Sequence, residues 1–151
     1  MNQQSFEHTL KTQIPIAWEA GVRFESYDGN SCSISVTLGL MNQNPFGSMF
    51  WAVEGMAAEF AGGMMLLSKI EATGVRMSTL VVNGNMNFTK KAVGKIVFTC
   101  NQGSKIDQEI EVAIATKEAR AFELTSIGID ETGDQVAEFV FTWSVLCSAE
   151  R

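Results

Sequence analysis

The sequence is poor in histidine, the residue around which many catalytic centres are assembled. It contains a single one, His8, in a polar N-terminal segment. Histidine-based metal sites and the Ser-His-Asp or Cys-His arrangements of nucleophilic catalysis all need a histidine beside the reacting group. We therefore expect no bound metal and no catalytic triad of these kinds, whereas a reaction driven by a carboxylate stays compatible with the composition.

Cysteine is also scarce, and positive charge is in the minority. Cys32, Cys100 and Cys147 lie far apart and form no CxxC pair, which is typical of reduced thiols that serve as small hydrophobic residues. Such thiols indicate a reducing compartment, so we expect a cytoplasmic protein. The net charge of -6 argues against a nucleic-acid partner, because phosphate backbones require a basic surface.

One apolar run, from Met49 to Leu67, has the length of a membrane span. Glu54, Glu59 and several glycines interrupt it, and a charge near the middle of a span costs about 2.5–3.5 kcal/mol. The first residues are polar and lack the apolar core of a signal peptide. We therefore expect a buried helix and no association with a membrane.

The pattern of apolar residues predicts both strands and helices. A tight turn at Asp28-Gly29-Asn30 indicates a hairpin of strands 21–27 and 31–38. The long helix is expected to start at Ser48 as N-cap and to end near Ile70, before Gly74. Further strands are predicted at 79–89, 95–100, 121–129 and 136–146, and short helices at 3–12 and 106–119. We expect one α+β domain over residues 1–151, with an antiparallel sheet wrapped around one long central helix.

Two glutamates distinguish the long helix from an ordinary core helix. A helix that is apolar on all sides is normally buried, and a buried carboxylate shifts its pKa or acquires hydrogen bonds. Gly55, Gly62 and Gly63 leave space around Glu59. Glu54 lies about 140° around the helix from Glu59, so we expect it to form a salt bridge or to reach the surface.

The arrangement of Asn44, Gly47 and Glu59 in a loop and the following helix resembles the hotdog-fold acyl-coenzyme A thioesterases of the phenylacetate-degradation type. The resemblance extends over nearly the whole chain. That family has a His-Gly-Gly at the start of the helix, whereas this chain has Phe50, Trp51 and Ala52, as in a divergent branch. The resemblance implies a hotdog fold, an acyl-CoA thioester substrate and no cofactor, since coenzyme A is part of the substrate. It also implies a homodimer, or a tetramer of two dimers, with sites at the subunit interface.

The resemblance also assigns roles near the start of the helix. Glu59 would be the general base or nucleophile of thioester hydrolysis, or else a structural carboxylate bonded to a strand. The backbone N–H of Trp51, beside Gly47, Ser48 and Phe50, would hold the oxyanion, unless Phe50 and Trp51 plug the core or an interface. Asn44 would position the reactants or act as a turn residue.

Two further groups are candidates for substrate binding. Asn83, Asn85 and Asn87 alternate with apolar residues that we expect to face the helix, so the asparagines should face a cleft, a subunit seam or solvent. Asn83 matches a position at which related thioesterases place a polar residue of the partner subunit. Lys90 and Lys91 would bind the phosphates of coenzyme A or remain solvated. The alternative function is a non-catalytic hotdog module that binds an acyl-CoA or an apolar carboxylate ligand.

Overall fold

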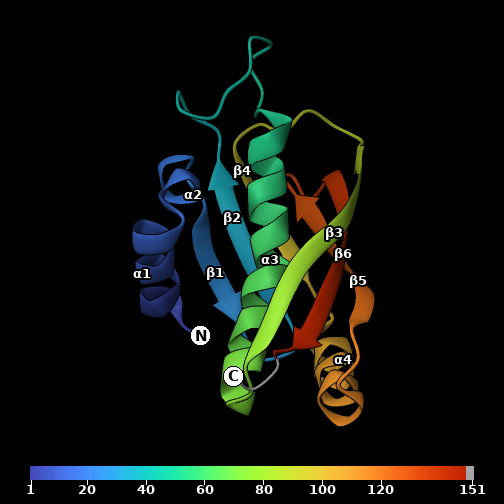
Figure 1. The fold of residues 1–151 in the computed structure, drawn as a ribbon. Coiled ribbons are helices and arrows are strands. Elements are labelled where there is room, and N and C mark those ends of the chain that lie inside the picture. Colours follow the sequence, from blue (N-terminus) through green and yellow to red (C-terminus); the bar gives the residue numbers. More distant parts are fainter. Residues whose placement is uncertain (149–151) are drawn as a thin grey trace.

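A computed structural model of the protein describes residues 1–148. Six strands form one antiparallel sheet in the order β1-β2-β4-β5-β6-β3, and a 23-residue helix lies across one of its faces (Figure 1). The strands are β1 (Arg23–Tyr27), β2 (Cys32–Thr37), β3 (Met77–Phe88), β4 (Lys95–Cys100), β5 (Arg120–Ile129) and β6 (Gln135–Cys147). The helices are α1 (Gln3–Gln13), α2 (Pro15–Glu19), α3 (Trp51–Thr73) and α4 (Gly103–Thr116). The predicted α+β arrangement is confirmed.

The core lies between α3 and the sheet, because α3 is apolar almost all the way round and packs on β2, β4, β5 and β6. Phe98 and Phe139 meet edge to face at 5.8 Å on the sheet side. On the other side of the helix, α1 places Phe6 against Phe60 at 6.1 Å. Cys32 is buried in the same core, where desolvation raises the pKa of its thiol to about 12. Burial on several sides explains why the helix has no clear polar face.

The boundaries of α3 differ from the prediction at the N-terminus. Phe50 is the N-cap and gives no side-chain hydrogen bond, so the prediction of Ser48 as N-cap is wrong. The Ser48 side chain instead bonds to Asn44 in the preceding loop. At the other end the helix continues to Thr73 and stops at Gly74, whose φ of 68° is the left-handed conformation that ends helices. None of the helices in the described part of the chain is both long enough and apolar enough to cross a membrane.

Strand β3 pairs only with β6 among the described residues, so its other edge is open. Gly84, Met86 and Phe88 lie opposite residues of β6 that face α3, and the asparagines between them therefore face away, as predicted. A register shift between Val81 and Asn83 leaves Val82 as the extra residue of a bulge. Most residues of the strand are exposed.

Candidate functional site

The loop before α3 is held together by the side chain of Asn44. Its Oδ1 accepts a hydrogen bond from the N–H of Phe46 at 2.9 Å, and its Nδ2 donates to the Ser48 hydroxyl at 3.0 Å and to the Met49 carbonyl at 3.2 Å. Gly47 adopts a φ of 75°, which a residue with a side chain rarely takes. Asn44 thus acts as a turn residue, and both hydrogens of its amide are used within the loop.

The first turn of α3 offers free backbone donors. The N–H groups of Trp51 and Ala52 have no intrahelical acceptor because they lie in the first turn. The N-cap residue Phe50 gives them no side-chain hydrogen bond, and the helix dipole makes this end positive. The side chains of Phe50 and Trp51 meet edge to face at 5.9 Å and are 46% and 51% exposed. They therefore do not plug the core of this chain.

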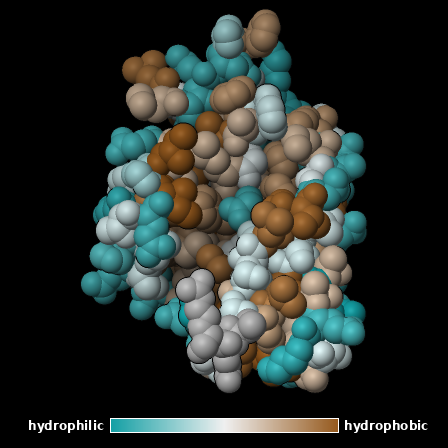
Figure 2. Space-filling model, viewed as in Figure 1, coloured by the Kyte–Doolittle hydropathy of each residue, from teal (hydrophilic) through white to brown (hydrophobic). Residues whose placement is uncertain are grey.

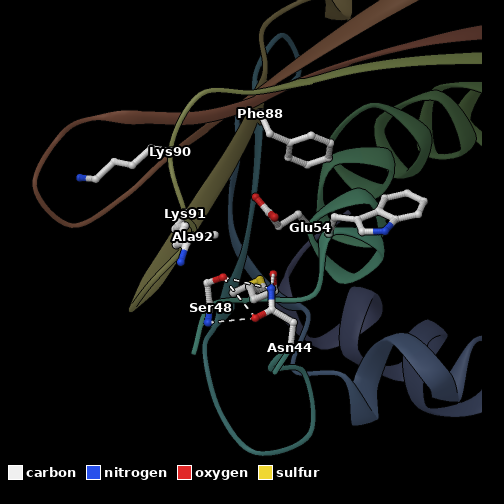
Figure 3. Close-up of a pocket in the computed structure, with 9 residues that line it drawn as sticks. Asn44, Ser48, Glu54, Phe88, Lys90, Lys91 and Ala92 are labelled. Atoms are coloured by element: carbon white, nitrogen blue, oxygen red, sulfur yellow. Dashed lines mark hydrogen bonds between the residues drawn. The ribbon is translucent and has the colours of Figure 1, made fainter. Parts of the chain in front are cut away.

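A cavity of about 350 Å³ opens at this end of the helix (Figure 3). Its walls include Asn44, Ser48, Trp51 and Glu54, and the segment from Phe88 to Ala92 closes the opposite side. The side chain of Phe88 lies on one side of the Glu54 carboxyl, and Lys91 and Ala92 lie on another (Figure 3). The loop, the helix start and the connection between β3 and β4 thus meet around a single carboxyl group.

Glu54 corrects the expectation of a salt-bridged or surface-reaching residue. It is only 4% exposed, its Oε1 has no hydrogen-bond partner, and no cation pairs with it among residues 1–148. Desolvation raises the pKa of this carboxyl to about 7. The expectation failed because the segment that follows β3 folds over the first turn of the helix, which the helix sequence alone does not indicate.

Glu59 lies on another side of α3 and does not line this cavity. It is partly buried, and desolvation raises the pKa of its carboxyl to about 7. A Cβ atom on Gly63 would lie 2.7 Å from its Oε1 and 2.9 Å from the ring of Trp143, so the missing side chain makes room for the carboxyl. Glu59 has neither a hydrogen bond nor an ion pair with the part of the chain that the structure describes. The structural alternative would require a hydrogen bond from a strand, and no strand among residues 1–148 donates one to Glu59.

The two candidate lysines differ in whether their ammonium groups are already engaged in ion pairs. The Lys90 ammonium pairs with Asp130 at 2.6 Å and with Asp134 at 2.8 Å, and its side chain points away from Glu54 (Figure 3). Lys91 lines the cavity and forms no ion pair with any of residues 1–148. Lys91 is thus available to a ligand, whereas Lys90 links the segment after β3 to the turn between β5 and β6.

The predicted site residues fall into two groups. The structure brings together Asn44, Ser48, Trp51 and the two lysines around the cavity. Gly47, Phe50, Asn83 and Glu59 lie outside it. Sequence reasoning missed Glu54 and Phe88 as parts of the same cavity. The only available signal was the acidic residue in the first turn of an otherwise apolar helix.

Comparison with known proteins assigns this fold and this loop–helix arrangement to a family. Residues 2–145 match a family described as a domain of unknown function, DUF4442. The chain belongs to the DUF4442 family. The sequence matches no curated protein.

Several solved structures share the fold of this DUF4442 chain. A Pseudomonas aeruginosa protein of unknown function, described as a "Probable Thioesterase", is 20% identical over 98% of this chain and 97% of its own, with a TM-score of 0.84. A Haemophilus influenzae thioesterase is 11% identical over 100% of this chain and 94% of its own, with a TM-score of 0.74. A Staphylococcus aureus thioesterase is 14% identical over 92% of this chain and 98% of its own, with a TM-score of 0.65. These similarities confirm the predicted hotdog fold.

Proposed function

We propose that this protein hydrolyses an acyl-coenzyme A thioester and that Glu59 is the general base. The observation that carries the proposal is the carboxyl of Glu59, which is partly buried, has no hydrogen-bond or ion-pair partner among residues 1–148 and lies in a space kept open by Gly63. Burial raises its pKa to about 7, where a carboxylate takes up and releases protons near neutral pH.

The proposed reaction needs a base and an oxyanion holder. Ionised Glu59 accepts a proton from water while the water oxygen attacks the thioester carbon. The carbonyl oxygen becomes an oxyanion, which accepts a hydrogen bond from the free N–H of Trp51 at the positive end of α3. Collapse of this intermediate breaks the carbon–sulfur bond and releases the acid and the thiolate, which takes the proton from Glu59 and so restores its carboxylate. Asn44 acts indirectly, by holding the loop that leads to these donors.

A second copy of the chain completes the site in this proposal, because Glu59 is not among the residues that line the cavity at Trp51. The open edge of β3 is the surface through which we propose that a homodimer forms. Leu80 and Val82 on that strand are 64% and 52% exposed, and apolar surface covers parts of β3 and α3 (Figure 2). Joining two β3 edges would place Asn83 at the seam and bring Glu59 toward the α3 N-terminus of the partner.

Residue spacing in a structural neighbour supports the pairing of Asn44 with Glu59. Variants of the Staphylococcus aureus protein have a glutamine or a glutamate replaced by alanine, at positions 15 residues apart. Asn44 and Glu59 are also 15 residues apart. The phosphates of coenzyme A would then lie near Lys91, the lysine at this cavity without an ion pair among residues 1–148.

The test is thiol release from short, long and aromatic acyl-CoA thioesters by wild type, Glu59→Gln and Glu71→Gln. Glu71 is an exposed acidic residue on the same helix, so its variant controls for the loss of one charge. We expect Glu59→Gln to lose at least about 100-fold in kcat, the usual contribution of a general base, and Glu71→Gln to keep full activity. Full activity in Glu59→Gln would contradict the mechanism.

One observation favours the alternative of a non-catalytic module that binds an acyl-CoA or an apolar carboxylate ligand. Both amide hydrogens of Asn44 are used inside the loop, which leaves none for a substrate oxygen. If wild type releases no thiol from any thioester, but the same compounds raise its melting temperature, the binding function replaces hydrolysis.

A further inference from the structure

Glu54 is a buried carboxyl for which the proposed hydrolysis has no role. Its side chain is 4% exposed, and its Oε1 has no hydrogen-bond partner in the part of the chain that the structure describes. A buried polar group left unpaired costs about 1–3 kcal/mol. The carboxyl points into the cavity at the start of α3 (Figure 3). A group bound in that cavity can therefore supply the missing hydrogen bond.

The surroundings of Glu54 restrict what that group can be. Phe88 and Ala92 give this part of the cavity an apolar wall, and the Lys90 ammonium is held elsewhere by two aspartates. Lys91 lines the same cavity with an ammonium that is unpaired among residues 1–148, which disfavours a cationic group there. A carboxylate brought directly against Glu54 would be repelled or desolvated at a cost. A plain hydrocarbon would leave the Glu54 oxygen unpaired. Because the last side-chain torsion of glutamate is broad, either oxygen can turn toward a neutral donor.

We propose that this cavity binds a neutral hydrogen-bond donor of the ligand, a hydroxyl or an amide N–H, and that Glu54 accepts its hydrogen bond. The identity of the ligand as an acyl-CoA rests on the proposed function, whereas the need of Glu54 for a donor does not. An acyl-CoA can supply the donor in two ways, from a hydroxyl on the acyl chain or from an amide of the pantetheine arm. Glu54 is then a specificity-determining residue distinct from the general base.

The experiment measures binding without turnover, in protein that carries Glu59→Gln. The probes are butyryl-CoA, 3-hydroxybutyryl-CoA, succinyl-CoA and free coenzyme A, titrated calorimetrically. Each is compared in the parent, in Glu54→Met, which keeps the size but has no hydrogen-bonding oxygen, and in Glu54→Gln, which keeps a carbonyl acceptor. Circular dichroism and light scattering check the fold and the mass of each variant, and Glu54→Gln carries the test if Glu54→Met does not fold.

A hydroxyl donor predicts that the parent binds 3-hydroxybutyryl-CoA at least tenfold more tightly than butyryl-CoA. Glu54→Met should abolish that preference, and Glu54→Gln should preserve it. A pantetheine donor predicts instead that Glu54→Met weakens the binding of butyryl-CoA and of coenzyme A equally, by at least tenfold. In either case succinyl-CoA should bind no more tightly than butyryl-CoA.

Three results would overturn the inference. The first is that Glu54→Met binds every probe as tightly as the parent. The second is that Glu54→Met loses the mass of the parent assembly, which would mean that a second copy supplies the donor. The third is that the parent binds none of the probes. Thiol release by wild type is measured separately. Hydrolysis can therefore fail while Glu54 still selects ligands, and Glu54 can fail to select ligands while hydrolysis proceeds.

Discussion

Replacing Glu54 with glutamine should stabilise the protein above pH 7 and change its stability little near pH 4.5. Burial raises the pKa of this carboxyl from 4.5 to about 7. Between these values the folded state binds more protons than the unfolded state, so the free energy of unfolding of wild type falls as the pH rises. From the two pKa values, the free energy of unfolding of wild type is lowered by roughly 3 kcal/mol at pH 8 and by about 1 kcal/mol or less at pH 5, relative to acid pH where the carboxyl is protonated in both states. Glutamine has nearly the same shape and cannot ionise, so the variant should avoid this loss.

The assay is urea denaturation at a fixed protein concentration from pH 4.5 to 8.5. A gain of roughly 3 kcal/mol at pH 8 corresponds to a rise of about 6–12 °C in the melting temperature of a chain of this length. Glu118→Gln, which removes an exposed carboxylate beyond the end of α4, controls for net charge. If the curves of Glu54→Gln and wild type run parallel from pH 4.5 to 8.5, the carboxyl does not ionise in an unpaired, buried state, and the argument is refuted.

Three more substitutions test the other parts of the structure. Gly63→Ala would place a Cβ 2.7 Å from Glu59 Oε1, so it should displace the carboxyl and lower thiol release at least tenfold. The control is Gly62→Ala, whose Cβ would lie 3.1 Å from Leu124. Equal turnover in both variants would contradict a space kept for Glu59. Val82→Glu puts a charge on the open edge of β3 and should halve the mass measured by light scattering, whereas an unchanged mass would exclude β3 as the dimer edge. Lys91→Glu should raise KM for a coenzyme A thioester at low salt, with a smaller effect at high salt because ions screen the charge, and a KM independent of salt would rule out a phosphate contact.

Much of the fold could be predicted from local patterns. The hairpin turn at Asp28-Gly29-Asn30 and the alternation of residues 31–38 identify β1 and β2, and the apolar residues of α3 identify the helix that covers the sheet. The bulge at Val82 could not be predicted, since it depends on how β3 follows β6 rather than on its own alternation. The start of α3 was misplaced because the Ser48 hydroxyl has a partner in Asn44 that competes with capping.

The site was harder to predict because its residues meet through tertiary contacts. Sequence spacing indicated Glu59 and its glycines, and the structure places that carboxyl beside the gap at Gly63. The same helix geometry led to a wrong expectation for Glu54. Its angle of about 140° from Glu59 shows only that the two point in different directions. Whether the second direction is solvent or a cavity depends on residues 88–92, which return to the helix from a distant strand.

Neither Glu54 nor Glu59 of α3 has an ion-pair partner among residues 1–148, but the reasons differ, and this difference separates their roles. Glu59 is partly exposed and lies beside Gly63, as does Trp143 of β6, the strand that pairs with β3, so in the proposed dimer a second copy of the chain can complete its surroundings. Glu54 is closed off by its own chain and faces a cavity, so a ligand is the group that can reach it. If dimerisation alone changed the ionisation of Glu54, and a ligand left it unchanged, the donor to Glu54 would come from the second copy and not from a ligand. Titrating the two carboxyls by NMR in the free dimer, in a monomeric β3-edge variant and with a bound ligand makes that distinction directly.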